Sequence, residues 1–161
     1  MLGASLFLAF FGGSVGYSAW KGGAPERWAA ALLLLGLIGS ASVGVVHIQG
    51  AFHSIPVRLA MVDATLASAL MLLAVRANRV WLIPLAACQV AAVLGHIAKL
   101  AAPDMVPLGY AFLVSIWGWP MTGLLVFGTR CQDKRAKAGR LDRPWRLCWR
   151  PSRRPAKPPS I

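Results

Sequence analysis

The sequence predicts an all-α transmembrane protein, an up-and-down bundle of five membrane-spanning helices followed by a disordered basic tail. Of the 161 residues, 57% are hydrophobic, and the mean hydropathy is +0.60. A soluble domain of this size would leave much of that apolar surface in water. In addition, five apolar runs are long enough to cross the ~30 Å hydrocarbon core of a bilayer, which takes about 20 helical residues.

The five predicted spans cover residues 2–20, 28–49, 57–75, 80–102 and 108–128. No basic segment precedes the first run, which favours a retained span over a cleaved signal peptide. The interruptions "KGGAPER", "GAFHSIP", "RANR" and "PDMVP" carry the Gly, Pro, Asn or charged residues typical of short turns. Such short loops join antiparallel neighbours, which gives the up-and-down order. Pro120 predicts a kink in the last span.

Small residues predict close helix packing. Gly12 and Gly16 form a GxxxG pattern, and Gly36, Ser40 and Gly44 recur at every fourth position of the second span. We expect these residues to pack within the chain, and contacts between copies of the chain stay open. A four-span alternative omits the glycine-rich first run.

The basic residues predict the orientation, because positive charge concentrates on the cytoplasmic side of a membrane. With the N-terminus outside and the C-terminus inside, 15 of the 17 Lys and Arg residues lie in the cytoplasm. Only Arg58 and Lys99 then lie near the outer side. The four-span alternative also keeps the C-terminus inside.

Residues 130–161 form the predicted tail, with 11 basic residues, two acidic residues and five prolines. This composition predicts disorder. Beside a membrane, each cation gains about 1 kcal/mol from anionic lipid, so we expect the tail to bind lipid headgroups. The residues expected to do so are Arg130, Lys134, Arg135, Lys137, Arg140, Trp145 and Trp149. Nucleic acid is a less favoured partner, because no stacking motif or folded module accompanies the charge.

Five polar residues lie inside the apolar runs and form the predicted intramembrane polar cluster, namely His47, Asp63, Gln89, His96 and Lys99. A charge at the bilayer centre costs about 2.5–3.5 kcal/mol, so such residues are functional candidates. The topology brings His47, Asp63 and His96 to one level near the outer side. Gln89, His96 and Lys99 share one helix face, which we expect to point inward. An unpaired Asp63 would be costly, so we expect His96 or Lys99 as its partner.

Three interpretations of this cluster compete. It is a structural set of hydrogen bonds that fixes helix register, or a proton or small-solute path lined by Asp63, Gln89 and His96. Alternatively, His47 and His96 ligate a haem iron, or these two with His53 and Asp63 hold a metal ion. Because no recognisable ligand spacing supports the last interpretation, no cofactor is predicted, with haem as the alternative.

Other residues weigh against an enzyme. No serine or cysteine nucleophile accompanies a base at a recognisable spacing, and neither HExxH nor a phosphate-binding glycine loop occurs. Cys88, Cys131 and Cys148 form no redox or zinc motif, so we expect free thiols. Trp117 and Trp119 lie near the middle of the last span, where they either pack or line a cavity for a hydrophobic ligand.

Two short stretches carry a resemblance. "GGAPERWAA", residues 22–30, and "RANRVWLIP", residues 76–84, followed by His96 and Tyr110, resemble a pattern of small, uncharacterised bacterial polytopic membrane proteins. The resemblance spans roughly residues 20–115. It implies a location in the bacterial inner membrane and brings no activity or binding residues with it.

The leading hypothesis is therefore a non-enzymatic accessory or scaffolding component of the membrane. Its partners would be the lipid bilayer and either further copies of the chain or a larger membrane complex. The alternative is a small oligomeric transporter or channel that uses Asp63 and His96. The third hypothesis is a haem- or metal-binding membrane subunit.

Overall fold

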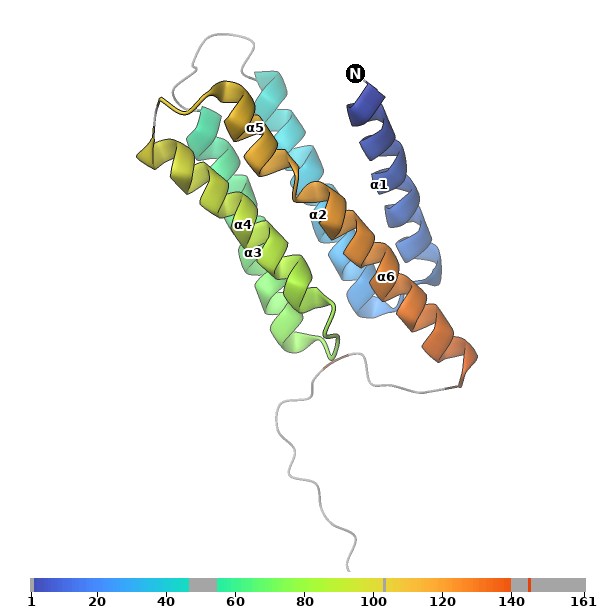
Figure 1. Cartoon of the computed structure of the whole chain (residues 1–161). Coiled ribbons are helices and arrows are strands. Elements are labelled where there is room, and N and C mark those ends of the chain that lie inside the picture. The colour runs from blue at the N-terminus through green and yellow to red at the C-terminus, as the bar shows by residue number, and fades with distance from the viewer. Residues whose placement is uncertain (1, 47–54, 103, 140–144, 146–161) are drawn as a thin grey trace, which may run out of the picture.

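The computed structural model describes residues 2–46, 55–102, 104–139 and Trp145. Its regular elements are helices (Figure 1), as the sequence predicts. They are α1 (Leu2–Lys21), α2 (Ala24–Val46), α3 (Ile55–Arg76), α4 (Leu82–Ala101), α5 (Pro107–Ser115) and α6 (Gly118–Lys137).

The helices form an up-and-down bundle. α1, α3 and the α5–α6 pair run in one direction, and α2 and α4 run in the other (Figure 1). We call the end where α1, α3 and α5 begin the upper end, and the end where α6 finishes the lower end. α3 packs on α2 and α4, whereas α1 packs mainly along α6 and also contacts α2.

Four stretches of the described residues are long and apolar enough to cross a membrane, namely Ala24–Val43, Val57–Arg76, Leu82–Ala101 and Leu108–Lys137. The protein is therefore a multi-pass membrane protein by its helix lengths and composition. Large apolar side chains cover its outside, and Trp20, Val80 and Leu108 are each more than 75% exposed. Such a surface suits lipid rather than water. α1 coincides with the first predicted span but is not among the four stretches.

The last stretch is broken between α5 and α6. Pro120 has no backbone N–H, so the carbonyl of Ile116 lacks its usual donor four residues later. The N–H of Trp119 lies 3.4 Å from that carbonyl instead. The expected kink is thus a helix break at residues 116–117, one turn before the proline.

The predicted start of a disordered tail at residue 130 is wrong, because α6 continues to Lys137. The ammonium of Lys137 lies 2.7 Å from the Asp133 carboxylate, one turn earlier on the same helix. Basic side chains also suit the negative end of a helix dipole. The helix stops before Gly139, whose φ of 66° is the left-handed conformation common at helix ends.

Trp145 occupies a different place from the one expected. It forms an isolated antiparallel bridge with Ala77 and packs, partly buried, against the hydrophobic core. Its indole therefore covers apolar side chains of the lower end, and its expected contact with lipid headgroups stays a prediction. Arg140 and Trp149, which we also expected to contact lipid, lie outside the described residues.

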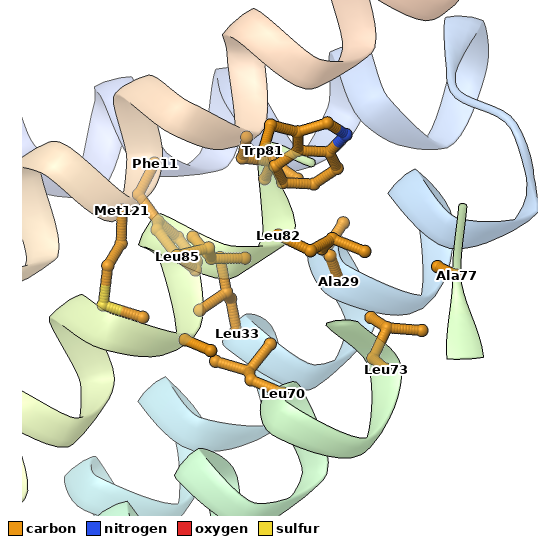
Figure 2. Close-up of a cluster of buried hydrophobic side chains, with 13 residues drawn as sticks. Phe11, Ala29, Leu33, Leu70, Leu73, Ala77, Trp81, Leu82, Leu85 and Met121 are labelled. Carbon is orange, nitrogen blue, oxygen red and sulfur yellow. The ribbon is translucent and has the colours of Figure 1, made fainter. Parts of the chain in front are cut away.

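The hydrophobic core fills mainly the lower half of the bundle, and Figure 2 shows its side chains from close by. Leu70, Leu85 and Leu125 are fully buried within it. Its members come from α1, α2, α3, α4, α6 and the turn between α3 and α4, and they are Phe11, Ala29, Ala30, Leu33, Leu70, Leu73, Ala77, Trp81, Leu82, Leu85, Ala86, Met121 and Leu125. The lower half is therefore well packed.

The small residues behave in two ways. A Cβ added at Gly36 would lie 2.5 Å from Cδ2 of Leu66, so α2 approaches α3 closely at this glycine. Cβ atoms added at Gly12 and Gly16 would have no neighbour within 4 Å. The expected packing within the chain is confirmed at Gly36 and wrong for the GxxxG pair of α1.

Candidate functional site

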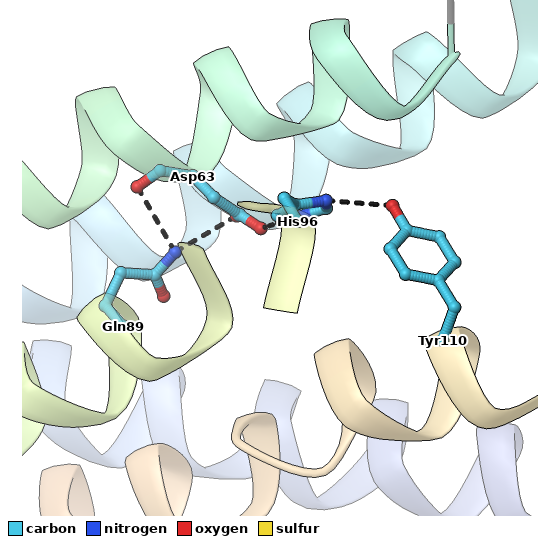
Figure 3. A network of polar contacts seen from close by, with 4 residues as sticks. All are labelled: Asp63, Gln89, His96 and Tyr110. Carbon is cyan, nitrogen blue, oxygen red and sulfur yellow. Dashed lines mark hydrogen bonds and ion pairs between the residues drawn. The ribbon is translucent and has the colours of Figure 1, made fainter. Parts of the chain in front are cut away.

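Asp63 lies in the upper half of α3, where α4 packs against it. Gln89 and His96 are seven residues apart on α4, so two helical turns bring them to the same face. That face points inward, since Gln89 is 4% exposed and His96 only 1%. Tyr110 comes from the first turn of α5 and faces His96 from the other side (Figure 3).

These four residues form a chain of hydrogen bonds that we call the Asp63 network. Nε2 of His96 lies 2.7 Å from Oδ2 of Asp63, and its Nδ1 lies 2.8 Å from the hydroxyl of Tyr110. The amide of Gln89 donates to Oδ1 of Asp63 over 3.0 Å. Three helices are thus joined through one carboxylate and one imidazole (Figure 3).

The Asp63 network can hold two different charges with the same hydrogen bonds. With a neutral imidazole, the Tyr110 hydroxyl donates to Nδ1, Nε2–H donates to the Asp63 carboxylate, and the net charge is −1. One added proton makes His96 an imidazolium that donates to both neighbours, and the net charge is then zero. The network is therefore chemically able to take up or release a proton in place.

A cavity of about 500 Å³ adjoins this network. Asp63 and Gln89 form one part of its wall, beside apolar side chains of α2 and α3. Aromatic side chains of α1 and of the region around the helix break form another part, namely Phe7, Phe11, Trp117 and Trp119. The cavity lies above the hydrophobic core, so the bundle is packed below and hollow above.

The break between α5 and α6 contributes to the cavity wall. Ser115, Trp117 and Gly118 all line it. A Cβ at Gly118 would lie 3.0 Å from the ring of Phe7, so a larger residue would press on the aromatic wall. Nε1 of Trp117 is buried and has no hydrogen-bond partner among the described residues. Both central tryptophans thus line a cavity, and Trp117 also packs against the hydrophobic core, so it fills both roles that the sequence left open.

Lys99, which the sequence also places in the polar cluster, has a hydrogen bond outside the Asp63 network. The ammonium of Lys99 donates to the carbonyl of Met105 over 2.9 Å, so it serves the connection between α4 and α5. His47 and His53 lie outside the described residues. Both ring nitrogens of His96 are already engaged, which does not fit a role as haem ligand. Within the described part of the chain, no three His, Cys, Asp or Glu side chains are grouped so that they could hold a metal ion.

A second polar cluster, the Glu26 clamp, lies at the lower end and consists of Ser18, Glu26, Arg79, Thr129 and Gln132. Glu26 is fully buried and Arg79 is 4% exposed, and their closest atoms, Oε1 and Nε, are 3.4 Å apart. Arg79 also donates to the amide oxygen of Gln132. The hydroxyls of Ser18 and Thr129 are 2.8 Å apart. The clamp therefore ties α1, α2 and α6 to the turn before α4.

The sequence did not assign these contacts. Glu26 and Arg79 occur in two loops, "KGGAPER" and "RANR", that the topology puts on the same side. Opposite charges in neighbouring loops were a usable signal for this ion pair. Tyr110 entered only through a resemblance. Its position near the start of the last span, at the level of His96, was the available signal.

Comparison with protein-family models, with curated proteins and with solved structures finds no match.

Proposed function

We propose that this chain is a multi-pass protein of the bacterial inner membrane that carries a small solute and couples its movement to a proton. In this proposal α1 is a fifth crossing, because it has 20 residues and packs along α6. The N-terminus lies outside and the C-terminus lies in the cytoplasm, since 15 of the 17 basic residues then fall on the cytoplasmic side.

One observation carries this proposal: Asp63 belongs to the cavity wall and to the hydrogen-bonded chain at the same time. A proton gained or lost anywhere along Asp63, His96 and Tyr110 changes the charge that faces the cavity. A solute bound in the cavity therefore interacts differently with the two charge states. Such a difference in interaction is what coupling between two ligands requires.

The unequal packing of the two halves supports a carrier. The lower half holds the hydrophobic core and the Glu26 clamp, whereas the upper half holds the cavity. The helix break at residues 116–117 lies at the cavity and offers a hinge. Five helices leave little room for alternating access in a single chain, so we propose that the carrier acts as an oligomer.

A scaffolding role is the second candidate. It is favoured by the completeness of the Asp63 network, in which Asp63, Gln89 and His96 are all hydrogen-bonded across helices. Such a set would fix helix register without any transport. Both candidates are non-enzymatic, and no contact of the described residues favours the haem hypothesis.

Proteoliposomes distinguish the carrier from the scaffold. The vesicles enclose a pH-sensitive dye and carry a pH gradient, and three probes are added in turn, namely benzyltrimethylammonium, benzenesulfonate and glucose. We expect one of them to change the internal pH at least about tenfold faster with the wild-type protein than with Asp63→Asn, since the loss of a close charge pair costs at least about 1.5 kcal/mol. Tyr110→Phe should slow the response as well.

Two matched controls accompany these variants. Asp133→Asn removes the partly exposed carboxylate of α6 that pairs with Lys137, and Tyr17→Phe removes the other tyrosine hydroxyl of the chain. Both should behave like the wild type. The carrier proposal is refuted if none of the three probes changes the internal pH. The scaffold is then retained if Asp63→Asn also lowers the thermal unfolding temperature.

A further inference from the structure

We propose that the cavity binds an organic cation with an apolar body, such as a quaternary ammonium compound, and that this cation takes the place of the extra proton of the Asp63 network. The inference deepens the proposed function, on which it rests, by assigning the class of solute.

The charge of the cavity wall favours a cation. Asp63 is the only charged side chain among the described residues that line the cavity. The rest of the wall is apolar or neutral, so an anion would meet a carboxylate and no cation. Transfer of a charge into such a space is costly unless a partner of opposite sign waits there. Asp63 is that partner for a cation.

The aromatic part of the wall suits the body of the same ligand. The rings of Phe7 and Trp119 meet edge to face with centroids 5.3 Å apart. Phe10 stacks on Trp119 from the outer side, with centroids 6.2 Å apart, and this holds the indole in place. Aromatic faces attract alkylammonium groups within about 6 Å of the ring centroid. The wall therefore offers both apolar contact and cation–π attraction.

Asp63 keeps acceptor capacity for the ligand. Each carboxylate oxygen accepts one hydrogen bond within the network and retains a further lone-pair site. Figure 3 shows the amide oxygen of Gln89 turned away from Asp63. A ligand with an N–H group could use these acceptors, and a quaternary ammonium would rely on charge alone.

Proton and cation compete because they neutralise the same carboxylate. α4 contributes Gln89 and His96 to the surroundings of Asp63, and α5 contributes Tyr110. The described cavity-lining residues of α1, α2 and α6 carry no charge. Two further cations lie on the same helices: Lys99, which bonds Met105, and Arg58, which is exposed five residues before Asp63.

The charge states then set the pH dependence. When the Asp63 network carries a net charge of −1, it neutralises the charge of a bound cation. With a net charge of zero, a bound cation would leave an uncompensated charge in an apolar site. Cation affinity should therefore fall as the pH is lowered through the range in which the network takes up its proton, and binding should release a proton.

Calorimetric titration of the protein in lipid nanodiscs tests this inference, with empty nanodiscs as the blank. The probes are benzyltrimethylammonium and its uncharged carbon isostere, neopentylbenzene. We expect the cation to bind at least about tenfold more tightly, which corresponds to the lower end of the range for close charge pairs. Asp63→Asn should remove that preference, and Asp133→Asn should retain it. Equal affinity for both probes in the wild type would overturn the inference.

The wild-type protein provides a test that needs no variant. Cation affinity should decrease by up to about tenfold per pH unit on the acidic side, and titrations in buffers of different ionisation enthalpy should show proton release. An affinity that stays flat over the whole pH range in which the protein remains folded would contradict the exchange. If the cation binds in nanodiscs but no probe changes the pH in proteoliposomes, the carrier proposal is refuted and the proposed binding site is retained. If another probe drives the pH change instead, the carrier stands and the assigned solute class is wrong.

Discussion

The side chain of His96 has fixed partners, because both ring nitrogens are hydrogen-bonded and only 1% of the residue is exposed. A buried imidazole with two partners is held in one orientation, which fixes the path of any proton between Tyr110 and Asp63. Depth and helical face were enough to suggest Asp63 as a partner. They did not reveal Tyr110, since an aromatic residue near a span end ordinarily indicates an interfacial belt.

A different residue tests the packing of the lower half. A Cβ at Gly128 of α6 would overlap the ring of Trp81, which is 8% exposed and belongs to the core. Gly128→Ala should therefore lower the free energy of unfolding by about 1–3 kcal/mol, the usual range for overpacking. SDS titration in mixed micelles measures this change.

Gly123→Ala on the same helix is the matched control. A Cβ at Gly123 would have no neighbour within 4 Å, and alanine favours a helix over glycine by up to about 1 kcal/mol. This variant should be as stable as the wild type or slightly more stable. If the two alanine variants unfold alike, the contact between Gly128 and Trp81 is not as close as described.

The helices could be predicted from the sequence where apolar residues form long runs, and less well in segments that contain many charged residues. The apolar runs predicted helices in the correct order, because a helix satisfies its own backbone hydrogen bonds inside a bilayer. The last run, however, is two helices, α5 and α6. The lower end of α6 was missed: its charges look like those of a tail, yet a helix can continue into water when pairs such as Asp133 and Lys137 support it. The Glu26 clamp was also not predicted, because it joins loops, and hydropathy does not show which loop residues come into contact.

The Glu26 clamp should stabilise the contacts of α1, α2 and α6 with the turn before α4. Arg79→Met leaves the fully buried carboxylate of Glu26 without its cation, which should cost about 3–5 kcal/mol of unfolding free energy. The double variant Glu26→Gln with Arg79→Met should lose less, since no buried charge then remains unpaired. Thermal unfolding in detergent measures both.

Arg76→Met is the control for this comparison. Arg76 is exposed at the end of α3, so removing its charge should change stability by less than about 0.5 kcal/mol. A double variant that is less stable than Arg79→Met alone would show that the clamp does not act as a charge pair.

At the scale of the whole molecule, packing divides the bundle into a tight lower half and a hollow upper half. Large side chains fill the lower half, whereas the cavity above is bordered by aromatic rings as well as by glycines, serines and the helix break. The sequence predicted neither half, because the same apolar residues serve for core, cavity wall and lipid contact. The sequence features that pointed to the upper half were the depth of Asp63 and His96 and the two tryptophans near the middle of the last span.

The crossing of α1 is the remaining question about the whole molecule, and single cysteines answer it. In a chain whose native cysteines are replaced by serine, Ser5→Cys marks the start of α1 and Ser160→Cys marks the C-terminus. With five crossings, an impermeant maleimide added to intact spheroplasts should label position 5 and leave position 160 unlabelled until the membrane is permeabilised. Because the four-crossing and five-crossing topologies both predict a cytoplasmic C-terminus, position 160 serves as the internal control. Labelling of position 5 only after permeabilisation would mean that α1 does not cross, and the bundle would then have the four crossings of its most apolar stretches.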